Sequence, residues 1–427
     1  MKKCISILFA CCAIAGETAA MKGSLSQRIT LKTPGNRAVT YNLRETAEGG
    51  GILEADRRLP LTVRRQKTET DDEIRIVLTL TAEDLLYYNV EQSFHTGLAH
   101  ENCLFYMPGF WYRKNLRSPE SAPSFHTGDS WQVREDRLST PLTGIYDERS
   151  GSYYTVLRTD TPDCEALACH NYGEVILSGK TSLGFTGFRN ADAHAALVFG
   201  FPYCEAPKSY VRKLTLAPAV RAFEKLEKGE TRRLTWTIRK GASPSYSSFV
   251  AEVWNDSFDT LDPRPVSPRH TPDEAKAILS EYFSRSYVGK YPLKFTSGVE
   301  LRTADCESTD IAEVGFVGRV LLNAFNALEY AEANGREQLA AEARSIFDSY
   351  LRYGFTPGGL IREVVDFKRE READVYSIRR QSEGLYALLN YLDYEKRHGR
   401  SHPRWEARIR TLLEKFRTLQ NPDGSFP

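Results

Sequence analysis

Apolar residues follow two different spacings along the chain. Up to about residue 250 they alternate with polar ones, and in the segment 73–80 this alternation places Ile74, Ile76, Leu78 and Leu80 on one face. Period two is typical of a β-strand with one buried face. Further strands are expected, between turns rich in Gly, Pro, Asn and Asp, at 28–32, 61–66, 153–158, 173–178, 194–201, 210–217 and 234–238. We therefore predict a large antiparallel β-sandwich over residues 21–255.

Residues 256–271 interrupt this pattern. The segment contains three prolines and few apolar side chains, so it is predicted to be a linker. Thr271-Pro272-Asp273-Glu274 then supplies an N-cap threonine, a proline at the first helical position and a glutamate at the third. Beyond it the apolar period is 3.6 residues. This period predicts a short hairpin at 291–303 and helices at 272–286, 310–334, 336–353, 378–399 and 403–419.

The predicted helices are of two kinds. Segments 310–334 and 378–392 are apolar around most of their circumference and contain small residues, which indicates buried helices. Segments 336–353 and 403–419 each carry one apolar stripe opposite Arg and Glu, which indicates outer helices. Inner and outer helices that alternate as hairpins are what an α/α toroid, a double ring of helices, requires. A plain helical bundle is the alternative.

The N-terminus has the pattern of a secretory signal over residues 1–20. Two lysines, Lys2 and Lys3, follow the first methionine. Residues 4–15 are almost wholly apolar, and the segment ends in small side chains. Leu8-Phe9-Ala10-Cys11 also resembles a bacterial lipoprotein box. We expect either lipidation at Cys11 or cleavage near Ala20, and in both cases a periplasmic or extracellular protein. Its only expected link to a membrane is a lipid anchor at Cys11.

Composition and charge exclude several function classes. The 427 residues include 57 Lys and Arg against 56 Asp and Glu, so no summed positive field favours nucleic acid as a partner. Aromatic residues make up 11%, and their flat rings suit the apolar faces of sugars as well as a well-filled core. The cysteines show no paired metal-ligand spacing, and nucleotide-binding glycine motifs are absent from the sequence. We therefore expect no metal and no cofactor.

Two sequence strings in the helical half resemble a known superfamily. They are Arg-Arg-Gln-Ser-Glu-Gly-Leu-Tyr at 379–386 and Leu-Gln-Asn-Pro-Asp-Gly-Ser-Phe-Pro at 419–427. With a signal segment, a sandwich and a linker before them, they resemble the six-hairpin glycosidase-like superfamily, specifically secreted polysaccharide-utilisation proteins of Bacteroides type. The resemblance covers most of 270–427. It implies a β + α two-domain protein whose (α/α)6 toroid, at 272–427, is C-terminally truncated.

The resemblance also implies a polysaccharide or oligosaccharide substrate. Glycosidic hydrolysis normally needs one protonated and one ionised carboxyl group beside the bond. By resemblance the toroid mouth lies at the N-terminal ends of the inner helices, where we find Asp310 and Glu383, and the loop between these helices adds Glu363. These three residues are the catalytic candidates. Glu383 is the first choice because an ionisable group is costly to bury, although an ion pair with Arg379 or Arg380 is its alternative role.

The candidates for substrate binding combine aromatic rings with guanidinium, amide and carboxylate groups, which suit pyranose faces and hydroxyls. They are Trp111, Tyr112, Arg134, Asp136, Arg379, Arg380 and Gln381. For Trp111 the alternative is a place in the core, and for Arg134 and Asp136 it is an internal ion pair.

Three functions follow from these observations. The first is a secreted glycoside hydrolase that uses a carboxylate pair, because by resemblance a sandwich placed before the toroid favours hydrolases over lyases. The second is a polysaccharide lyase, in which a Tyr, His or Lys base acts while arginines neutralise a uronate. The third is a glycan-binding protein without catalysis.

Overall fold

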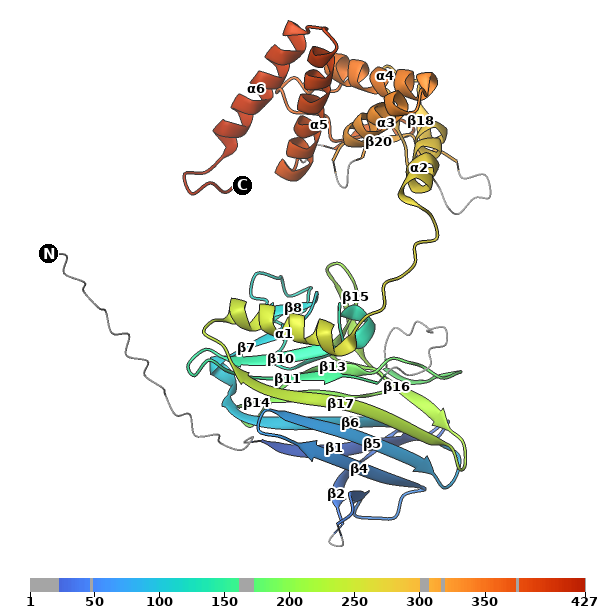
Figure 1. Ribbon diagram of the computed structural model, residues 1–427, viewed down its shortest axis with the longest axis vertical. Coiled ribbons are helices and arrows are strands. Elements are labelled where there is room, and N and C mark those ends of the chain that lie inside the picture. The colour runs from blue at the N-terminus through green and yellow to red at the C-terminus, as the bar shows by residue number, and fades with distance from the viewer. Residues whose placement is uncertain are drawn as a thin grey trace, which may run out of the picture. The chain divides into compact units, whose positions relative to one another are not determined.

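The structure is a computed structural model that describes residues 23–46, 49–160, 173–299, 307–315, 319–373 and 376–426. The chain divides into two units, Met1–Arg264 and Pro265–Pro427, coloured from blue to yellow-green and from yellow to red in Figure 1. Among the described residues, the first unit is built mainly from strands with one α-helix, and the second from helices with short strands. The chain is therefore of the β + α class. The predicted signal segment, with Cys11, lies outside the described residues.

The first unit contains strands that pair mostly antiparallel in one continuous sheet. They are β1 Ser24–Lys32, β2 Val39–Glu45, β3 Ile52–Glu54, β4 Leu61–Glu69, β5 Glu73–Ala82, β6 Leu86–Ala99, β7 Cys103–Met107, β8 Trp111–Arg113, β9 Trp131–Arg134, β10 Leu142–Asp147, β11 Ser152–Arg158, β12 Gly173–Ile176, β13 Phe185–Ala191, β14 His194–Phe201, β15 Cys204–Arg212, β16 Thr215–Leu226 and β17 Thr231–Ala242. The single strand expected at 210–217 is instead the tip of a hairpin, because 210–212 end β15, 215–217 begin β16, and Leu214 in the turn between them takes a positive φ of 56°. Only β12 and β16, among the pairs formed by these strands, run parallel.

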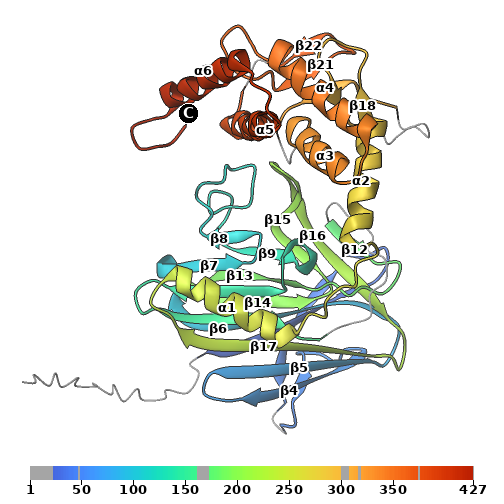
Figure 2. The same cartoon turned by 45° about the horizontal axis from the view of Figure 1, so that its top comes forward.

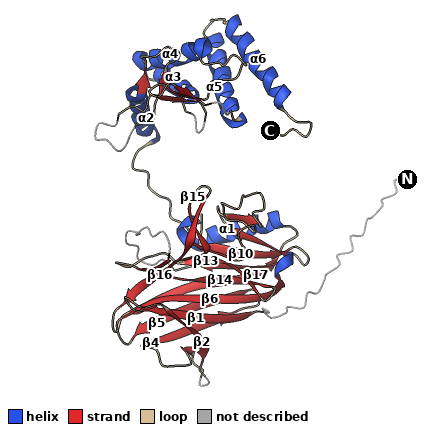
Figure 3. Ribbon diagram, turned by 180° about the vertical axis from the view of Figure 1, so that it is seen from behind, coloured by secondary structure: helices blue, strands red, loops and turns tan. Residues whose placement is uncertain are grey.

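The sheet folds into two layers around the main core (Figure 3). In one layer the order is β2-β1-β6-β14-β13-β9, and in the other β4-β5-β17-β11-β10-β7-β8. The alternation predicted for 73–80 is present, because Ile74, Ile76, Leu78 and Leu80 are all buried in the shared core. Apolar side chains of both inner faces fill this core, as expected for a β-sandwich.

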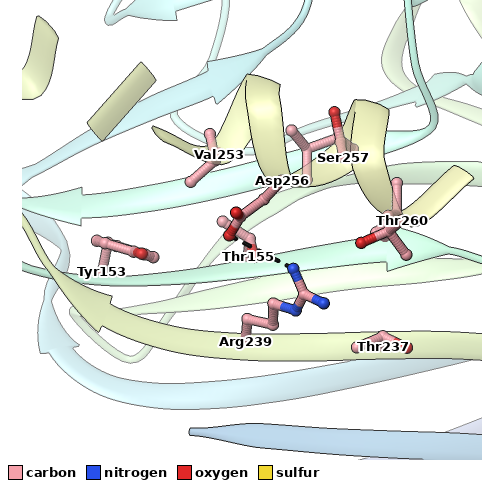
Figure 4. Close-up of a pocket in the computed structure, with 10 residues that line it drawn as sticks. Tyr153, Thr155, Thr237, Arg239, Val253, Asp256, Ser257 and Thr260 are labelled. Carbon is pink, nitrogen blue, oxygen red and sulfur yellow. Dashed lines mark ion pairs between the residues drawn. The ribbon is translucent and has the colours of Figure 1, made fainter. Parts of the chain in front are cut away.

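Helix α1, Tyr246–Leu261, covers the outer face of the second layer (Figure 2). Ser245 caps it by accepting a hydrogen bond from the Ser248 amide. Phe249 and Val253 of the helix pack on side chains that point outward from β7, β10 and β11. Figure 4 shows a small pocket beneath the helix, where Arg239 of β17 pairs with Asp256 at 3.4 Å. Its 20 Å³ volume is close to the size of one water molecule, so it is a packing gap.

The segment predicted as a linker, 256–271, therefore begins inside a helix. Residues 256–261 form the last turns of α1, and Asp262 ends it with a left-handed φ of 42°. Four of these six residues are polar, Asp256, Ser257, Asp259 and Thr260, so their composition resembles that of a linker. Ser257 is nevertheless buried against the sheet, which shows why the helix continues.

The second unit contains five helices, α2 to α6, among the residues described for it. They are α2 Pro272–Ser286, α3 Leu321–Ala333, α4 Glu337–Tyr353, α5 Ile378–Arg397 and α6 Pro403–Leu419. Short strand pairs join β18 Tyr287–Val288 to β19 Phe295–Thr296, and connect β20 Ile311–Glu313, β21 Val364–Asp366 and β22 Arg371–Glu372. The capping box predicted at Thr271 and Glu274 is present. No helix of the described chain is long and apolar enough to cross a bilayer.

Helix α3 begins later than the predicted 310–334. Asp310 and Gly315 take positive φ angles of 51° and 73°, which a continuous helix does not allow. Between them, residues 311–313 pair with β21 instead. The N-terminal part of the predicted inner helix is therefore a strand and a turn, and this difference brings Glu313 to the edge of a small sheet.

The prediction of inner and outer helices agrees with the structure only in part. Helix α4, expected outside, buries eight of its residues against the other helices. Helix α6 buries only Ile409 and Leu412, as an outer helix should. Helix α5, expected to be buried all round, leaves Tyr386 58% and Leu389 41% exposed. The burial of a helix therefore depends on which other helices pack against it, and the width of its apolar stripe does not predict it.

Candidate functional site

The N-terminal end of α5 brings together a cluster of charged groups from distant parts of the second unit. Glu313 ends β20, and the register Glu313↔Val364 places this residue beside the chain that leads into β21. Glu363 immediately precedes β21, and its carbonyl accepts a hydrogen bond from the Val314 amide at 2.8 Å. Two elements that are 50 residues apart in sequence thus supply carboxylates to one place.

Glu363 is fully buried and anchors the first turn of α5. Its Oε1 accepts hydrogen bonds from the Ser377 amide at 2.8 Å and from Gln381 Nε2 at 3.0 Å. Its Oε2 lies 3.8 Å from Arg380 Nη1 and has no hydrogen-bond partner within the described structure. Gln381, itself buried, also donates to the Ile361 carbonyl and accepts from the Ile361 amide. These contacts fix Arg380 in position.

Arg380 links Glu363 to Glu313. Its Nη2 donates to Glu313 Oε1 at 3.0 Å, and Arg319 donates to the other carboxylate oxygen. Glu313 is therefore paired with two guanidinium groups, yet its side chain stays 19% exposed. Gly315 allows this close approach, because a Cβ there would lie 2.6 Å from Arg380 Cα.

A large groove opens beside this cluster, between α2 and α3. Its volume is 1050 Å³, and Glu313 and Arg319 form one part of its wall. Helix α3 contributes amide, carboxylate and phenol groups from Asn323, Asn326, Glu329 and Tyr330. Helix α2 contributes the exposed apolar side chains of Leu279 and Tyr282. A groove that combines apolar surface with hydrogen-bonding groups suits a polyhydroxylated ligand.

Asp310 is buried behind the groove rather than in it. Lys290 pairs with its Oδ2 at 2.5 Å, Tyr291 donates to the same oxygen at 2.9 Å, and Ser308 donates to Oδ1 at 2.6 Å. Burial raises its pKa, but the hydrogen bonds from Lys290, Ser308 and Tyr291 lower the pKa of Asp310 to about 2. A carboxylate held in this way is suited to fixing the chain ahead of β20 and poorly suited to donating a proton.

Glu383 and Arg379 lie on the first two turns of α5 but outside the groove lining. Glu383 is partly exposed and Arg379 is exposed. Of the predicted residues, the structure brings Glu363, Arg380 and Gln381 into direct contact with one another. Asp310 does not belong to this group. It accepts hydrogen bonds from other residues, just before β20 of the small sheet.

The remaining predicted residues belong to the first unit. Trp111 is fully buried, because β8 pairs with β7 and the indole packs on the core and donates to the Arg113 carbonyl at 2.9 Å. This burial does not agree with the expectation that it stacks on a sugar. Arg134 and Asp136 form the internal ion pair that was the alternative, with contacts of 2.9 and 2.5 Å. Tyr112 is 49% exposed, and Asp136 is also exposed.

Sequence reasoning missed the polar face of α3. Asn323, Asn326 and Tyr330 are spaced i, i+3 and i+7, so they share one side of an otherwise apolar helix. That spacing is a signal that the sequence does contain. These side chains line a groove only because α2 lies opposite them, and the hydrophobic pattern does not predict that packing.

Other chemistry is sparse within the described ranges. No group of three or more metal-ligating side chains occurs there. Cys103 and Cys204 are buried thiols, and burial raises their pKa values to about 12 and about 11, so both stay protonated. Cys164, Cys169 and Cys306 lie outside the described residues.

No protein-family model matches the sequence, and a comparison with curated proteins finds no match. Among solved structures, a polysaccharide lyase is similar with a TM-score of 0.41 and 9% identity over 91% of this chain, which spans 61% of the lyase. A galactose mutarotase-like protein from Clostridium acetobutylicum gives a TM-score of 0.24 and 8% identity, with 52% of this chain and 63% of that protein covered. Both names refer to carbohydrate chemistry in those proteins. We base the function of this chain on its own geometry.

Proposed function

We propose that the chain is a carbohydrate-active enzyme that binds a polysaccharide or its oligosaccharides in the groove between α2 and α3. The observation that carries this proposal is the groove itself, in which a doubly paired carboxylate, three side-chain amides and phenol rings line a volume of 1050 Å³. Amide and carboxylate groups hydrogen-bond sugar hydroxyls, while apolar and aromatic side chains cover sugar faces. The volume is sufficient for several pyranose rings.

We propose hydrolysis as the reaction. Glu313 of β20 and Glu329 of α3 are two of the three carboxyl groups of the groove wall, and Asp273 of α2 is the third. Glu313 is held in a fixed position by Arg319 and Arg380, which suits a carboxylate that orients or activates water, and Glu329 is exposed to the bound ligand. In this proposal Glu363 is a positioning residue that holds Arg380, rather than a group that touches substrate.

A polysaccharide lyase is the second candidate. It is favoured by the presence of Tyr282, Tyr330 and Arg319 in the same groove. A phenol can accept the proton next to a uronate while a guanidinium neutralises the carboxylate. A lyase would leave an unsaturated product, whereas a hydrolase would not.

The architecture and location proposed for the chain follow from the sequence. We propose that α2 to α6 are helical hairpins of an (α/α) toroid of the six-hairpin glycosidase-like type. The basic and apolar N-terminal segment supports a periplasmic or extracellular location, with a lipid anchor at Cys11 as one form.

A substrate screen with a matched pair of variants tests the proposal. The full chain is incubated with a panel of plant and host polysaccharides, and reducing ends and ultraviolet absorbance are recorded together. Reducing ends alone support hydrolysis, and new absorbance supports the lyase. Glu313→Gln should lower turnover at least about 100-fold, as loss of general acid–base chemistry does. Glu281→Gln, on an exposed side chain of α2 outside the groove, is the control.

Three results would count against the proposal. If Glu313→Gln keeps full activity, the groove is not the reacting site. If Glu383→Gln abolishes activity while Glu313→Gln does not, catalysis belongs to the exposed side of α5. If glycans bind without any turnover, the chain is a binding protein.

A further inference from the structure

A second pocket of the second unit is built from α4, the C-terminal half of α5 and the start of α6. Its volume is 510 Å³, and it shares no lining residue with the groove between α2 and α3. Charged and aromatic side chains make up its whole wall. They are Arg344, Asp348, Arg352, Tyr391, Glu395, Arg400, His402 and Trp405.

One carboxylate of this pocket, that of Glu395, is already paired with other side chains of the protein. Glu395 is buried and receives Arg400 through two hydrogen bonds of 2.8 and 2.7 Å, and His402 Nε2 at 2.7 Å. Burial raises its pKa, but these hydrogen bonds outweigh burial and lower the pKa of Glu395. The His402 ring in turn stacks on Trp405, with 3.7 Å between ring centroids. Glu395 therefore fixes the aromatic wall and one guanidinium of the pocket.

The other carboxylate has no such partner. Asp348 makes no hydrogen bond or ion pair with any residue in the described part of the chain. Desolvation and the nearby charge of Glu395 raise the pKa of Asp348, although the charges of His402, Arg352 and Arg344 oppose this shift. A half-hydrated carboxyl group in a pocket is a hydrogen-bonding group that a ligand hydroxyl can satisfy.

The pocket also carries an excess of positive charge. Three guanidinium groups face two carboxyl groups, and only Arg400 is committed to a carboxylate ion pair. The Arg352 guanidinium lies 5.8 Å from the centre of the Tyr353 ring, and Arg344 donates a hydrogen bond to the Tyr394 hydroxyl. Within the described residues, neither guanidinium forms a salt bridge. Guanidinium groups recognise carboxylates with two parallel hydrogen bonds.

We propose that this pocket binds a sugar that carries an anionic group, and specifically a uronate residue of a polysaccharide. Arg344 and Arg352 receive the carboxylate, Asp348 receives a ring hydroxyl, and Trp405 provides an apolar edge. An inorganic anion alone would leave Asp348 unpaired and facing a negative charge, whereas a uronate satisfies both kinds of group. The site is independent of the reaction proposed for the groove, because the two pockets have no residue in common.

Binding measurements on the full chain test this inference. Isothermal titration calorimetry compares an oligogalacturonate, a sulfated oligosaccharide, a neutral oligosaccharide of the same length and inorganic sulfate. The expected result is binding of the oligogalacturonate that becomes at least about 10-fold weaker in Arg352→Gln and in Arg344→Gln, and also weaker in Asp348→Asn. Arg404→Gln is the matched control, because Arg404 is an exposed arginine of α6 that does not line the pocket.

The outcomes separate the alternatives. Tighter binding of the sulfated sugar with the same dependence on Arg352 would overturn the assignment of a uronate and make sulfate the recognised group. Equal binding of the neutral sugar, equal binding of inorganic sulfate, or no effect of the arginine variants would overturn the inference. Glu313→Gln should keep uronate affinity in this pocket, so failure of the groove as a catalytic site does not affect the result. Circular dichroism of each variant establishes that it folds. Because Arg352 is exposed, its replacement should leave the core intact.

Discussion

Replacing Glu363 tests whether the buried carboxylate organises the start of α5. In Glu363→Ala the Ser377 amide and the Gln381 side chain lose their shared acceptor. Each buried donor left unpaired costs about 1–3 kcal/mol. The loss of the ion pair between Glu363 and Arg380 adds little to this cost, because the two groups are 3.8 Å apart and the Arg380 side chain is 29% exposed. The free energy of unfolding of the second unit should therefore fall by about 2–6 kcal/mol, the sum for two such donors.

Glu363→Gln separates hydrogen bonding from charge. A glutamine carbonyl can replace Oε1 and accept from the Ser377 amide and Gln381, while its amide group faces Arg380 without attraction. We expect a loss of about 1–2 kcal/mol, smaller than that of the alanine variant. Glu414→Gln, in an exposed pair with Arg417 on α6, should change stability by less than about 0.5 kcal/mol.

The assay is urea unfolding followed by far-ultraviolet circular dichroism, since the helices lie mostly in the second unit. The two units can unfold separately, so the transition that carries the helical signal is fitted by itself. A loss below about 1 kcal/mol for Glu363→Ala, or equal losses for the alanine and glutamine variants, would refute the reasoning.

Two further predictions concern the residues around the small sheet. Because the pKa of folded Asp310 is about 2, below its value of 3.8 in an unfolded chain, its contribution to stability is present above about pH 4 and is lost as the pH falls toward 2. Asp310→Asn should remove about 2 kcal/mol at neutral pH and flatten the decline measured by urea midpoints between these pH values; parallel curves for the two proteins would contradict this. Gly315→Ala should cost about 2 kcal/mol or more, because the new Cβ combines a φ of 73° with a contact of 2.6 Å to Arg380. The control Gly335→Ala has a φ of 63° but nothing within 4 Å, so equal losses in the two variants would exclude the contact as the cause.

The sequence predicts elements well where their period is unambiguous. The alternation in β5 and the capping box of α2 are both local signals, and both are present in the structure. The sequence does not predict helix α1, because four of the residues 256–261 are polar and the apolar Phe258 among them is exposed. The helix is stabilised by Phe249 and Val253 on outward-facing side chains of β7, β10 and β11, a contact between segments far apart in the sequence.

The candidate site depends even more on distant contacts. Glu363 and Gln381 were predicted as site residues, but their role as anchors depends on the Ile361 backbone and the Ser377 amide. Glu313 reaches Arg380 only because a strand replaces the first turns of the predicted helix. The toroid predicted from the alternation of helices remains a prediction, because α4 and α5 each bury eight residues and do not separate into an outer and an inner helix.

The central claim is that the groove between α2 and α3 binds carbohydrate. The most direct measurement is a crystal structure of Glu313→Gln with an oligosaccharide identified in the substrate screen. We predict sugar density between the two helices, with ring hydroxyls within hydrogen-bond distance of Asn323 and Asn326. Sugar bound only in the first unit, beside Tyr112, with an empty groove would contradict the account.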